Sequence, residues 1–407
     1  MSWEKVKLGD VSNSIQTGPF GSQLHQSDYS EFGTPVVMPK DMVGGKILED
    51  SIARVEEQHV ARLSRHKVNV GDVLYARRGD VGKCSLVTKK EEGWLCGTGC
   101  LKVSFDFSKV NPKFVFYQLQ KPETIGWVEK HAVGATMLNL NTGILESVPI
   151  ELPELKVQNK IVNILSAYDD LIENNQKQIK LLEEAAQRLY KQWFIDLRYP
   201  GHETTKIVDG LPEGWRTVSI QDVCKNIGAG GTPSRSQKNF WENGNIDWFK
   251  TQELCDCWLF EASEKISEEG LKRSAAKMFP ANSILMAIYA SPTLGRLGIL
   301  TKEACSNQAA LCLQADESKV SNYWLYLKLF ELRDRFNSIA RGAGQQNISG
   351  IIVKETEITL PAYSVMENFT EMVKPFFEKQ KTLQLQNISL TQTRDRLLPK
   401  LMNGGVI

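Results

Sequence analysis

Two long segments of the chain carry apolar residues at helical spacing. The first, residues 154–198, has no Gly or Pro before Pro200 and Gly201, which is typical of one continuous helix. The second, residues 362–403, ends at a Gly pair. An apolar stripe along a whole helix needs a partner, so we expect the two helices to pair with each other. The stripe positions are Ile161, Tyr168, Asn175, Leu182 and Leu189 in the first segment, and Phe369, Phe376, Leu383, Leu390 and Leu397 in the second.

Four residues in these segments predict local features. Asn175 is polar within an apolar stripe, so it is either a tolerated residue near the edge of the contact or a residue that fixes the register of pairing. Pro375 predicts a kink or a delayed regular start of the second helix, because proline removes a backbone donor. Ser364 and Glu367 have the spacing of a capping box, which predicts a helix start at Ser364.

The two halves of the chain repeat each other. An apolar alternation that opens at Trp3 recurs from Trp215, and Val73–Ala76 corresponds to Ile284–Ala287 at nearly the same spacing. A repeat of this length indicates a tandem duplication in which each unit is a domain followed by a long helix. The expected divisions are a first domain at 1–153, a first long helix at 154–198, a linker at 199–214, a second domain at 215–361 and a second long helix at 362–403.

Within each domain, short apolar runs alternate with Gly, Pro, Asn and Asp. This pattern predicts strands such as Val73–Ala76 and Leu101–Phe105, carried on long loops. The segments Pro112–Leu119 and Asn322–Phe336 have helical spacing. The fold class we expect is therefore α+β, with two repeated domains and two long helices.

Composition places the chain among globular proteins. Its 407 residues are too many for a single hydrophobic core, and the formal net charge is only +1. No apolar run approaches the roughly 18 residues that a membrane span needs, and the first residues lack the shape of a signal peptide, so we expect no membrane partner and a cytoplasmic location. The eight cysteines show no paired CxxC spacing, which favours free thiols over a zinc site.

Catalytic motifs are poorly supported. Gly228-Ala-Gly-Gly-Thr-Pro233 has a proline where a dinucleotide-binding loop needs glycine, and the chain has no phosphate-binding P-loop. Asn111-Pro-Lys-Phe114 is similar to the base-binding loop of adenine methyltransferases, but it lacks the second proline and any upstream Gly-rich cofactor loop. The five histidines are scattered. The sequence therefore predicts a protein without a catalytic site, metal or cofactor of its own.

Polar residues that can contact DNA recur in the loops of both domains. Arg offers two donors to guanine, Asn and Gln pair with adenine, and Lys mainly contacts phosphate. Any one of these residues is more often a solvated surface residue, so it is their recurrence in both repeats that supports DNA binding. The candidate DNA-binding residues are Gln16, Ser22, Gln23, Lys40, Arg77, Arg78, Lys83, Arg235, Lys238, Lys250, Tyr289, Arg296, Asn307 and Gln308.

Taken in order, these motifs resemble the specificity subunit of type I restriction-modification enzymes over nearly the whole chain. The second helix departs from the first at one position, because Met366 stands where the first helix has Gln158. The motifs that carry the resemblance are Thr17–Ser22, Ala76–Lys83, Gly230–Ser234 with Trp241 and Trp248, Asn307-Gln308, and Pro153 leading to Gln158.

The resemblance implies a fold and a set of partners. Two target recognition domains would each read one half of an asymmetric, bipartite site on double-stranded DNA, and the two helices would pair as an antiparallel coiled coil. Two methyltransferase subunits carrying S-adenosylmethionine would bind this chain, and restriction subunits would supply ATP-driven and Mg-dependent cleavage. This chain would be a non-catalytic recognition subunit.

Two other interpretations remain open from the sequence. One is a specificity subunit whose single partner fuses nuclease and methyltransferase. The other is a duplicated scaffold that binds protein, which the near-zero net charge favours, because a lone DNA-binding protein is usually basic.

Overall fold

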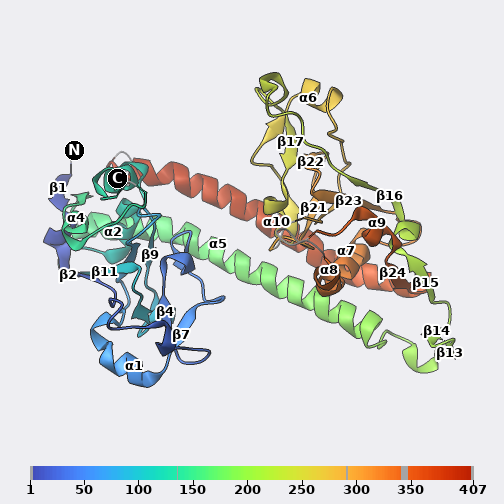
Figure 1. Cartoon of the computed structure of the whole chain (residues 1–407), viewed down its shortest axis with the longest axis horizontal. Coiled ribbons are helices and arrows are strands. Elements are labelled where there is room, and N and C mark those ends of the chain that lie inside the picture. Colours follow the sequence, from blue (N-terminus) through green and yellow to red (C-terminus); the bar gives the residue numbers. More distant parts are fainter. Residues whose placement is uncertain (1–2, 135, 290–291, 341–346, 405–407) are drawn as a thin grey trace. The chain divides into compact units, whose positions relative to one another are not determined.

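The computed structural model describes residues 3–134, 136–289, 292–340 and 347–404. It contains two compact units (Figure 1). Unit 1 comprises Met1–Leu171 and Leu390–Ile407, and unit 2 comprises Ile172–Ser389. Each long helix thus contributes one part to each unit.

Unit 1 is built on a central four-stranded antiparallel sheet in the order β2-β11-β8-β9. A second sheet has the order β10-β4-β7-β3, and β1 pairs with β12. The strands are β1 Glu4–Lys7, β2 Ser12–Thr17, β3 Tyr29–Ser30, β4 Thr34–Val37, β5 Met42–Val43, β6 Lys46–Ile47, β7 Ala53–Val55, β8 Val73–Ala76, β9 Cys84–Leu86, β10 Leu95–Cys96, β11 Cys100–Phe105 and β12 Pro149–Leu152. The helices are α1 Glu57–Arg62, α2 Pro112–Leu119, α3 Pro122–His131 and α4 Thr142–Glu146.

Unit 2 repeats this plan with a five-stranded sheet in the order β16-β23-β20-β21-β18. A three-stranded sheet has the order β19-β17-β22, and β15 pairs with β24. The strands are β15 Arg216–Ser219, β16 Cys224–Ala229, β17 Ile246–Phe249, β18 Cys257–Leu259, β19 Lys265–Ile266, β20 Ile284–Ala287, β21 Leu297–Leu300, β22 Cys305–Ser306, β23 Ala310–Ala315 and β24 Glu357–Leu360. The helices are α6 Glu268–Lys272, α7 Asn322–Glu331, α8 Arg333–Ile339 and α9 Gly350–Glu355.

The predicted duplication and α+β class are confirmed. The strands β2, β8, β9 and β11 correspond in order and pairing to β16, β20, β21 and β23. The central strands β8 and β20 are buried on both faces, which explains why their sequences read as unbroken apolar runs rather than as alternation. The units differ at β18, which extends the sheet of unit 2, whereas β5 and β6 of unit 1 form a separate hairpin.

The two long helices are α5, Leu155–Tyr190, and α10, Tyr363–Met402 (Figure 1). A π-helical turn, Lys191–Ile195, follows α5. Within unit 2 the Tyr190 and Phe369 ring centroids lie 6.1 Å apart, and Asn175 bonds to Asn387. Residues late in α5 thus contact residues early in α10, which is an antiparallel arrangement. Within unit 1, Arg394 bonds to Asp169 in the same sense.

The structure corrects three local predictions. Helix α10 begins at Tyr363, so Ser364 lies inside its first turn and does not cap it. The helix continues without interruption past Pro375, so its regular start is not delayed there. The segment 199–214 is more than a polar linker, because β13 Ile207–Val208 pairs with β14 Leu211–Pro212 and the buried Tyr199 ring packs 5.3 Å from Trp215.

The predicted helix Asn322–Phe336 is divided into α7 and α8 at Leu332. Among the described residues, no helix is long and apolar enough to cross a membrane, and no cluster of acidic, His and Cys side chains could hold a metal ion. The cysteines are free thiols.

Candidate nucleic-acid interface

One end of the central sheet in unit 1 collects the predicted polar loops. Strands β2 and β8 finish at this end and β9 and β11 begin there, because Thr17 pairs with Leu101 and Ala76 with Cys100. The backbone N–H of Gly18 donates to the Cys100 carbonyl at 2.9 Å, and that of Arg77 donates to the Gly99 carbonyl at 2.8 Å. The loop after β2 and the loop between β8 and β9 are therefore both held against the residues that open β11.

A glycine allows this close approach in both units. A Cβ at Gly18 would lie 1.8 Å from the Gly97 carbonyl oxygen, and a Cβ at Gly230 would lie 2.2 Å from the Ser306 carbonyl oxygen. Any other residue would push the loop after the first long strand away from the turn that precedes β11 in unit 1, or β23 in unit 2. This requirement explains why each domain carries a Gly directly after its first long strand.

Several predicted residues of unit 1 gather at this end. The Arg77 guanidinium lies 5.3 Å from the centroid of the Phe20 ring, and the Gln23 Oε1 accepts from the Phe20 backbone N–H at 3.2 Å. Arg78 is exposed, and its backbone bridges to Asn139. Ser22 and Lys83, exposed and half-buried respectively, lie in the same loops.

Two predicted residues of unit 1 donate hydrogen bonds to backbone carbonyls outside this group. Gln16, in β2, donates through Nε2 to the Arg65 carbonyl at 2.7 Å. Lys40 donates to the Ser51 carbonyl at 3.3 Å and remains exposed. Gln16 thus positions the Arg65 backbone, and Lys40 lies outside the Phe20–Arg77 cluster.

Lys102 is not among the residues predicted to bind DNA, because it lies in the middle of an apolar strand. It is 5 % exposed, and its Nζ donates to the carbonyls of Lys67 and Arg65 at 2.6 and 3.2 Å. Burial, followed by the charges of Arg65 and Lys102, lowers the pKa of the adjacent His66 to about 4. Lys102 therefore anchors the loop 65–67 beside a neutral histidine.

Unit 2 has the same arrangement at the equivalent end of its sheet. The Gly230 N–H donates to the Ala310 carbonyl at 3.1 Å, and the Ile288 N–H donates to the Ala309 carbonyl at 2.9 Å. Thr232 donates through its hydroxyl to the exposed Gln308. The neighbouring Asn307 is half-buried, and its Oδ1 has no hydrogen-bond partner within the described chain.

Two pairs of predicted residues occupy equivalent positions in the units. Arg78 bridges to Asn139 as Tyr289 bridges to Asn347. The Ala76 N–H donates to the Lys83 carbonyl at 2.8 Å, as the Ala287 N–H donates to the Arg296 carbonyl at 2.9 Å. Lys83 and Arg296 are thus matched basic residues at the end of the same loop. Of these, Tyr289 is 37 % exposed and Arg296 half-buried.

Unit 2 also holds a cluster of charged and indole side chains, which we call the Arg235 cluster: Arg235, Trp241, Trp248, Lys250 and Glu264. The Arg235 guanidinium lies 3.7 Å from the Trp241 ring centroid, and Glu264 bonds to both Arg235 and Lys250. The predicted Lys238 lies nearby in sequence, in the short 3-10 helix Lys238–Phe240, and is exposed. Glu264 was not predicted, because no sequence pattern links it to residues 14 and 29 positions away.

All ten predicted stripe residues of the long helices are buried or half-buried. Ile161 lies in the core of unit 1 with Leu397 packed against it, and Phe369 lies in the core of unit 2. Gln158 is fully buried, and its amide bonds to the backbone of Lys109, Asn111 and Pro153. Gln158 therefore joins α5 to its own domain. Met366, at the matching position of α10, is buried in the core of unit 2.

Asn111 caps a helix in the structure. Its side-chain oxygen accepts from the Lys113 and Phe114 backbone N–H groups at the start of α2, and its amide nitrogen donates to Asn159. The motif that is similar to a methyltransferase loop is thus a structural cap followed by a proline at the first helical position.

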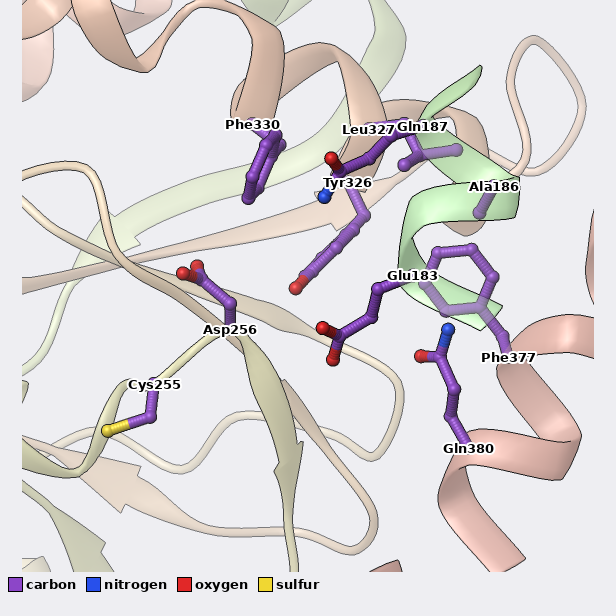
Figure 2. Close-up of a pocket in the computed structure, with 10 residues that line it drawn as sticks. All are labelled: Glu183, Ala186, Gln187, Cys255, Asp256, Tyr326, Leu327, Phe330, Phe377 and Gln380. Carbon is purple, nitrogen blue, oxygen red and sulfur yellow. The ribbon is translucent and has the colours of Figure 1, made fainter. Parts of the chain in front are cut away.

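A cavity of about 230 Å³ in unit 2 is lined by α5, α7, α10 and the turn before β18 (Figure 2). Figure 2 shows the carboxylates of Glu183 and Asp256 and the hydroxyl of Tyr326 directed into it. Asp256 is paired with Arg333. Burial, followed by the charge of Asp256, raises the pKa of Glu183 to about 7. None of the predicted site residues lines the cavity.

Comparison with known proteins gives one consistent result. The family described as the type I restriction modification DNA specificity domain matches residues 1–184 and again 212–389. A type I restriction enzyme specificity subunit of Haemophilus influenzae, HindI, is 23% identical over 99% of both chains. The MjaIX specificity subunit of Methanocaldococcus jannaschii is 24% identical over 99% of this chain and 93% of that one.

Similarity to a solved structure concerns the fold. The crystal structure of the S subunit of a type I restriction-modification system from M. genitalium covers 98% of this chain and 96% of its own, with a TM-score of 0.60 and 16% identity. The duplicated arrangement of domains and long helices is therefore shared with that structure.

Proposed function

Because the chain belongs to the family of type I restriction-modification DNA specificity domains, we propose that each of its two domains reads one half of an asymmetric, bipartite site on double-stranded DNA. The matched relatives are specificity subunits, and the prediction of a non-catalytic specificity subunit is confirmed by this membership. Recognition of the DNA sequence is thus the task of this chain, and chemistry belongs to other subunits.

The observation that carries the proposal is the repeated sheet end. In each unit the same loops leave the same end of the central sheet, and matched basic residues, Lys83 and Arg296, occupy the same position in them. The side chains that differ between the units, such as Arg78 and Tyr289, would then select different bases. Two domains of the same fold that carry different side chains can recognise two different half-sites, as an asymmetric DNA site requires.

The proposed partners supply the remaining activities. Two methyltransferase subunits with bound S-adenosylmethionine would methylate adenine, and restriction subunits using ATP and Mg would cleave. The long helices α5 and α10 would pair as a coiled coil and offer docking surfaces for these subunits. Partners that complete a basic channel around DNA would also explain how a chain of net charge +1 serves in DNA binding.

The test is adenine methylation across the host genome, measured by direct single-molecule sequencing with and without this gene. We expect one bipartite motif to lose its methylation when the gene is deleted. An unchanged methylome in cells that still express the neighbouring methyltransferase genes would contradict the proposal and favour the protein-binding scaffold. A partner with fused nuclease and methyltransferase would be recognised by the size of the subunit that copurifies with this chain.

A further inference from the structure

We propose that Arg235 reads a guanine in the half-site recognised by unit 2, and that Glu264 is its positioning residue. The inference rests on the proposed function and assigns one base to one side chain. It follows from the geometry of the Arg235 cluster, which holds an arginine in one place while leaving much of it accessible.

Two indole rings form the platform on which Arg235 lies. Its guanidinium carbon is 3.7 Å from the Trp241 ring centroid and 5.2 Å from that of Trp248. The two rings are nearly perpendicular, with centroids 5.0 Å apart. An arginine stacked in this way keeps its N–H groups in the plane of the guanidinium, where they can bond outward.

The same indoles fix the loop that carries Arg235. The Trp248 Nε1–H donates to the Gly231 carbonyl at 2.9 Å, and the Trp241 Nε1–H donates to the Ser234 carbonyl at 3.1 Å. Trp248 is 2 % exposed, so its ring is held by the core of the smaller sheet. Both the backbone and the side chain of Arg235 are thus constrained before any DNA arrives, which reduces the entropy lost on binding.

Glu264 sets the orientation of the guanidinium. One of its oxygens accepts from Arg235 Nη1, and the other accepts from Lys250 Nζ at 2.7 Å. These two bonds hold the pKa of Glu264 below its ordinary value, so the carboxylate stays charged. The side chain of Arg235 is nevertheless 55 % exposed. The bond to Glu264 occupies one of its five N–H donors and leaves the others free to bond elsewhere.

The free donors suit guanine. In the major groove guanine presents two acceptors, O6 and N7, side by side, whereas adenine presents an acceptor and a donor. A guanidinium can bond to both guanine acceptors at once but would face a donor on adenine. An arginine whose orientation is fixed by the charged Glu264 carboxylate can therefore discriminate between these two bases.

Among the described residues, the Arg235 cluster has no counterpart at the matching positions of unit 1. Strand pairing places Val36 of unit 1 where unit 2 has Trp248, because Val36 pairs with Leu95 in parallel as Trp248 pairs with Cys305. Met38 stands in the place of Lys250, since the backbone N–H of each bonds to the acidic side chain three residues later. We therefore expect the guanine contact made by an arginine cluster of this kind in only one half-site.

The experiment uses the full chain in complex with its methyltransferase subunits and measures Kd for the cognate duplex and for duplexes changed at one base pair at a time. Arg235→Ala should abolish discrimination at one G·C pair in one half-site, a loss of roughly 10- to 100-fold, and leave the other half-site unaffected. Arg235→Lys keeps the charge but not the two-pronged geometry and should not restore discrimination. Glu264→Gln should reduce discrimination at the same base pair while binding to random DNA is unchanged.

Arg273→Ala is the matched control, because Arg273 is an exposed arginine of the same unit that is paired with Glu269. An equal loss of affinity for every duplex in Arg235→Ala would identify a phosphate contact and overturn the inference. Full discrimination in Arg235→Lys would show that a single positive charge suffices, and would overturn the two-pronged contact with guanine. A wild-type complex that binds all duplexes equally would instead overturn the proposed function, and the inference with it.

Discussion

Asn175 and Asn387 form a side-chain hydrogen bond between the two long helices within unit 2. The Asn175 Nδ2 donates to the Asn387 Oδ1 at 2.9 Å, and Asn175 is only 3 % exposed. Of the two interpretations that the sequence left open, this geometry favours the residue that fixes register, because a shifted alignment would leave a buried amide against apolar side chains. The pair thus favours one alignment of α5 and α10 within unit 2.

Replacing Asn175 alone should expose the role of this pair. Asn175→Leu leaves the Asn387 amide without its partner, so we expect the free energy of unfolding to fall by about 1–3 kcal/mol. The double variant Asn175→Leu, Asn387→Leu should recover most of this loss, because both polar groups are then gone. Urea denaturation of the single and double variants forms a double-mutant cycle. A single variant as stable as the parent chain would contradict the assignment.

Phe369 is the stripe residue most closely surrounded by other rings. It is fully buried, and its centroid lies 4.8 Å from Phe194 and 5.7 Å from Trp193. Phe369→Ala should therefore destabilise the chain by about 3–5 kcal/mol, through lost burial and the cavity that remains. Phe32→Ala is the control, because Phe32 is 80 % exposed and should change stability little. Thermal unfolding followed by circular dichroism measures both, and equal losses would show that ring burial at Phe369 is not the cause.

Secondary-structure elements whose sequence pattern is local could be predicted from the sequence. Val73–Ala76 and Pro112–Leu119 match β8 and α2 residue for residue, because an unbroken apolar run and a helical period are local patterns. The prediction that a capping box starts the helix at Ser364 was wrong, because the chain enters α10 directly from Pro361 and Ala362. The Ser364 hydroxyl therefore lies inside the helix.

The partners of individual side chains at distant positions could not be predicted from the sequence. The candidate loop residues were chosen by residue type, which says nothing about their partners: Gln16 bonds to the Arg65 backbone 49 residues away. Glu264 could not be identified from the sequence, because it meets Arg235, 29 positions away, only in the folded chain. Lys102 was hidden because a charged residue among apolar neighbours in a strand gives no sign of the carbonyls it will meet.

Lys83 and Arg296 offer a matched test of two independent readers. Each closes the same loop in its own unit, so each substitution should affect only one half-site. In the complex with methyltransferase subunits, binding is measured on the cognate duplex and on duplexes with one half-site or the other scrambled. Lys83→Ala should shrink the penalty for scrambling one half-site, and Arg296→Ala the penalty for the other, by about 1–3 kcal/mol for a base contact.

The salt dependence of binding separates base from phosphate contacts in the same variants. A residue that contacts only phosphate should weaken binding on every duplex and reduce the slope of log K against log salt by about one. A loss that is spread equally over both half-sites without a change in slope would contradict the assignment of one reader to each unit.

Glu183 should make stability depend on pH. Its pKa rises from 4.5 to about 7 in the folded chain, because of burial and the nearby Asp256, with Lys180 acting in the opposite direction. Between these values the folded chain binds a proton that the unfolded chain has released, so raising the pH from about 5 to 8 lowers stability.

Glu183→Gln removes the ionisation and should be more stable than the parent at pH 8, by at most about 3 kcal/mol, with the difference fading towards pH 5. Urea denaturation across this range gives the result, with Glu371→Gln, an exposed carboxylate of α10 in the same unit, as the control for charge. A gain of equal size and pH dependence in both variants, or a gain for Glu183→Gln that persists at pH 5, would show that the buried carboxylate in the cavity is not its source.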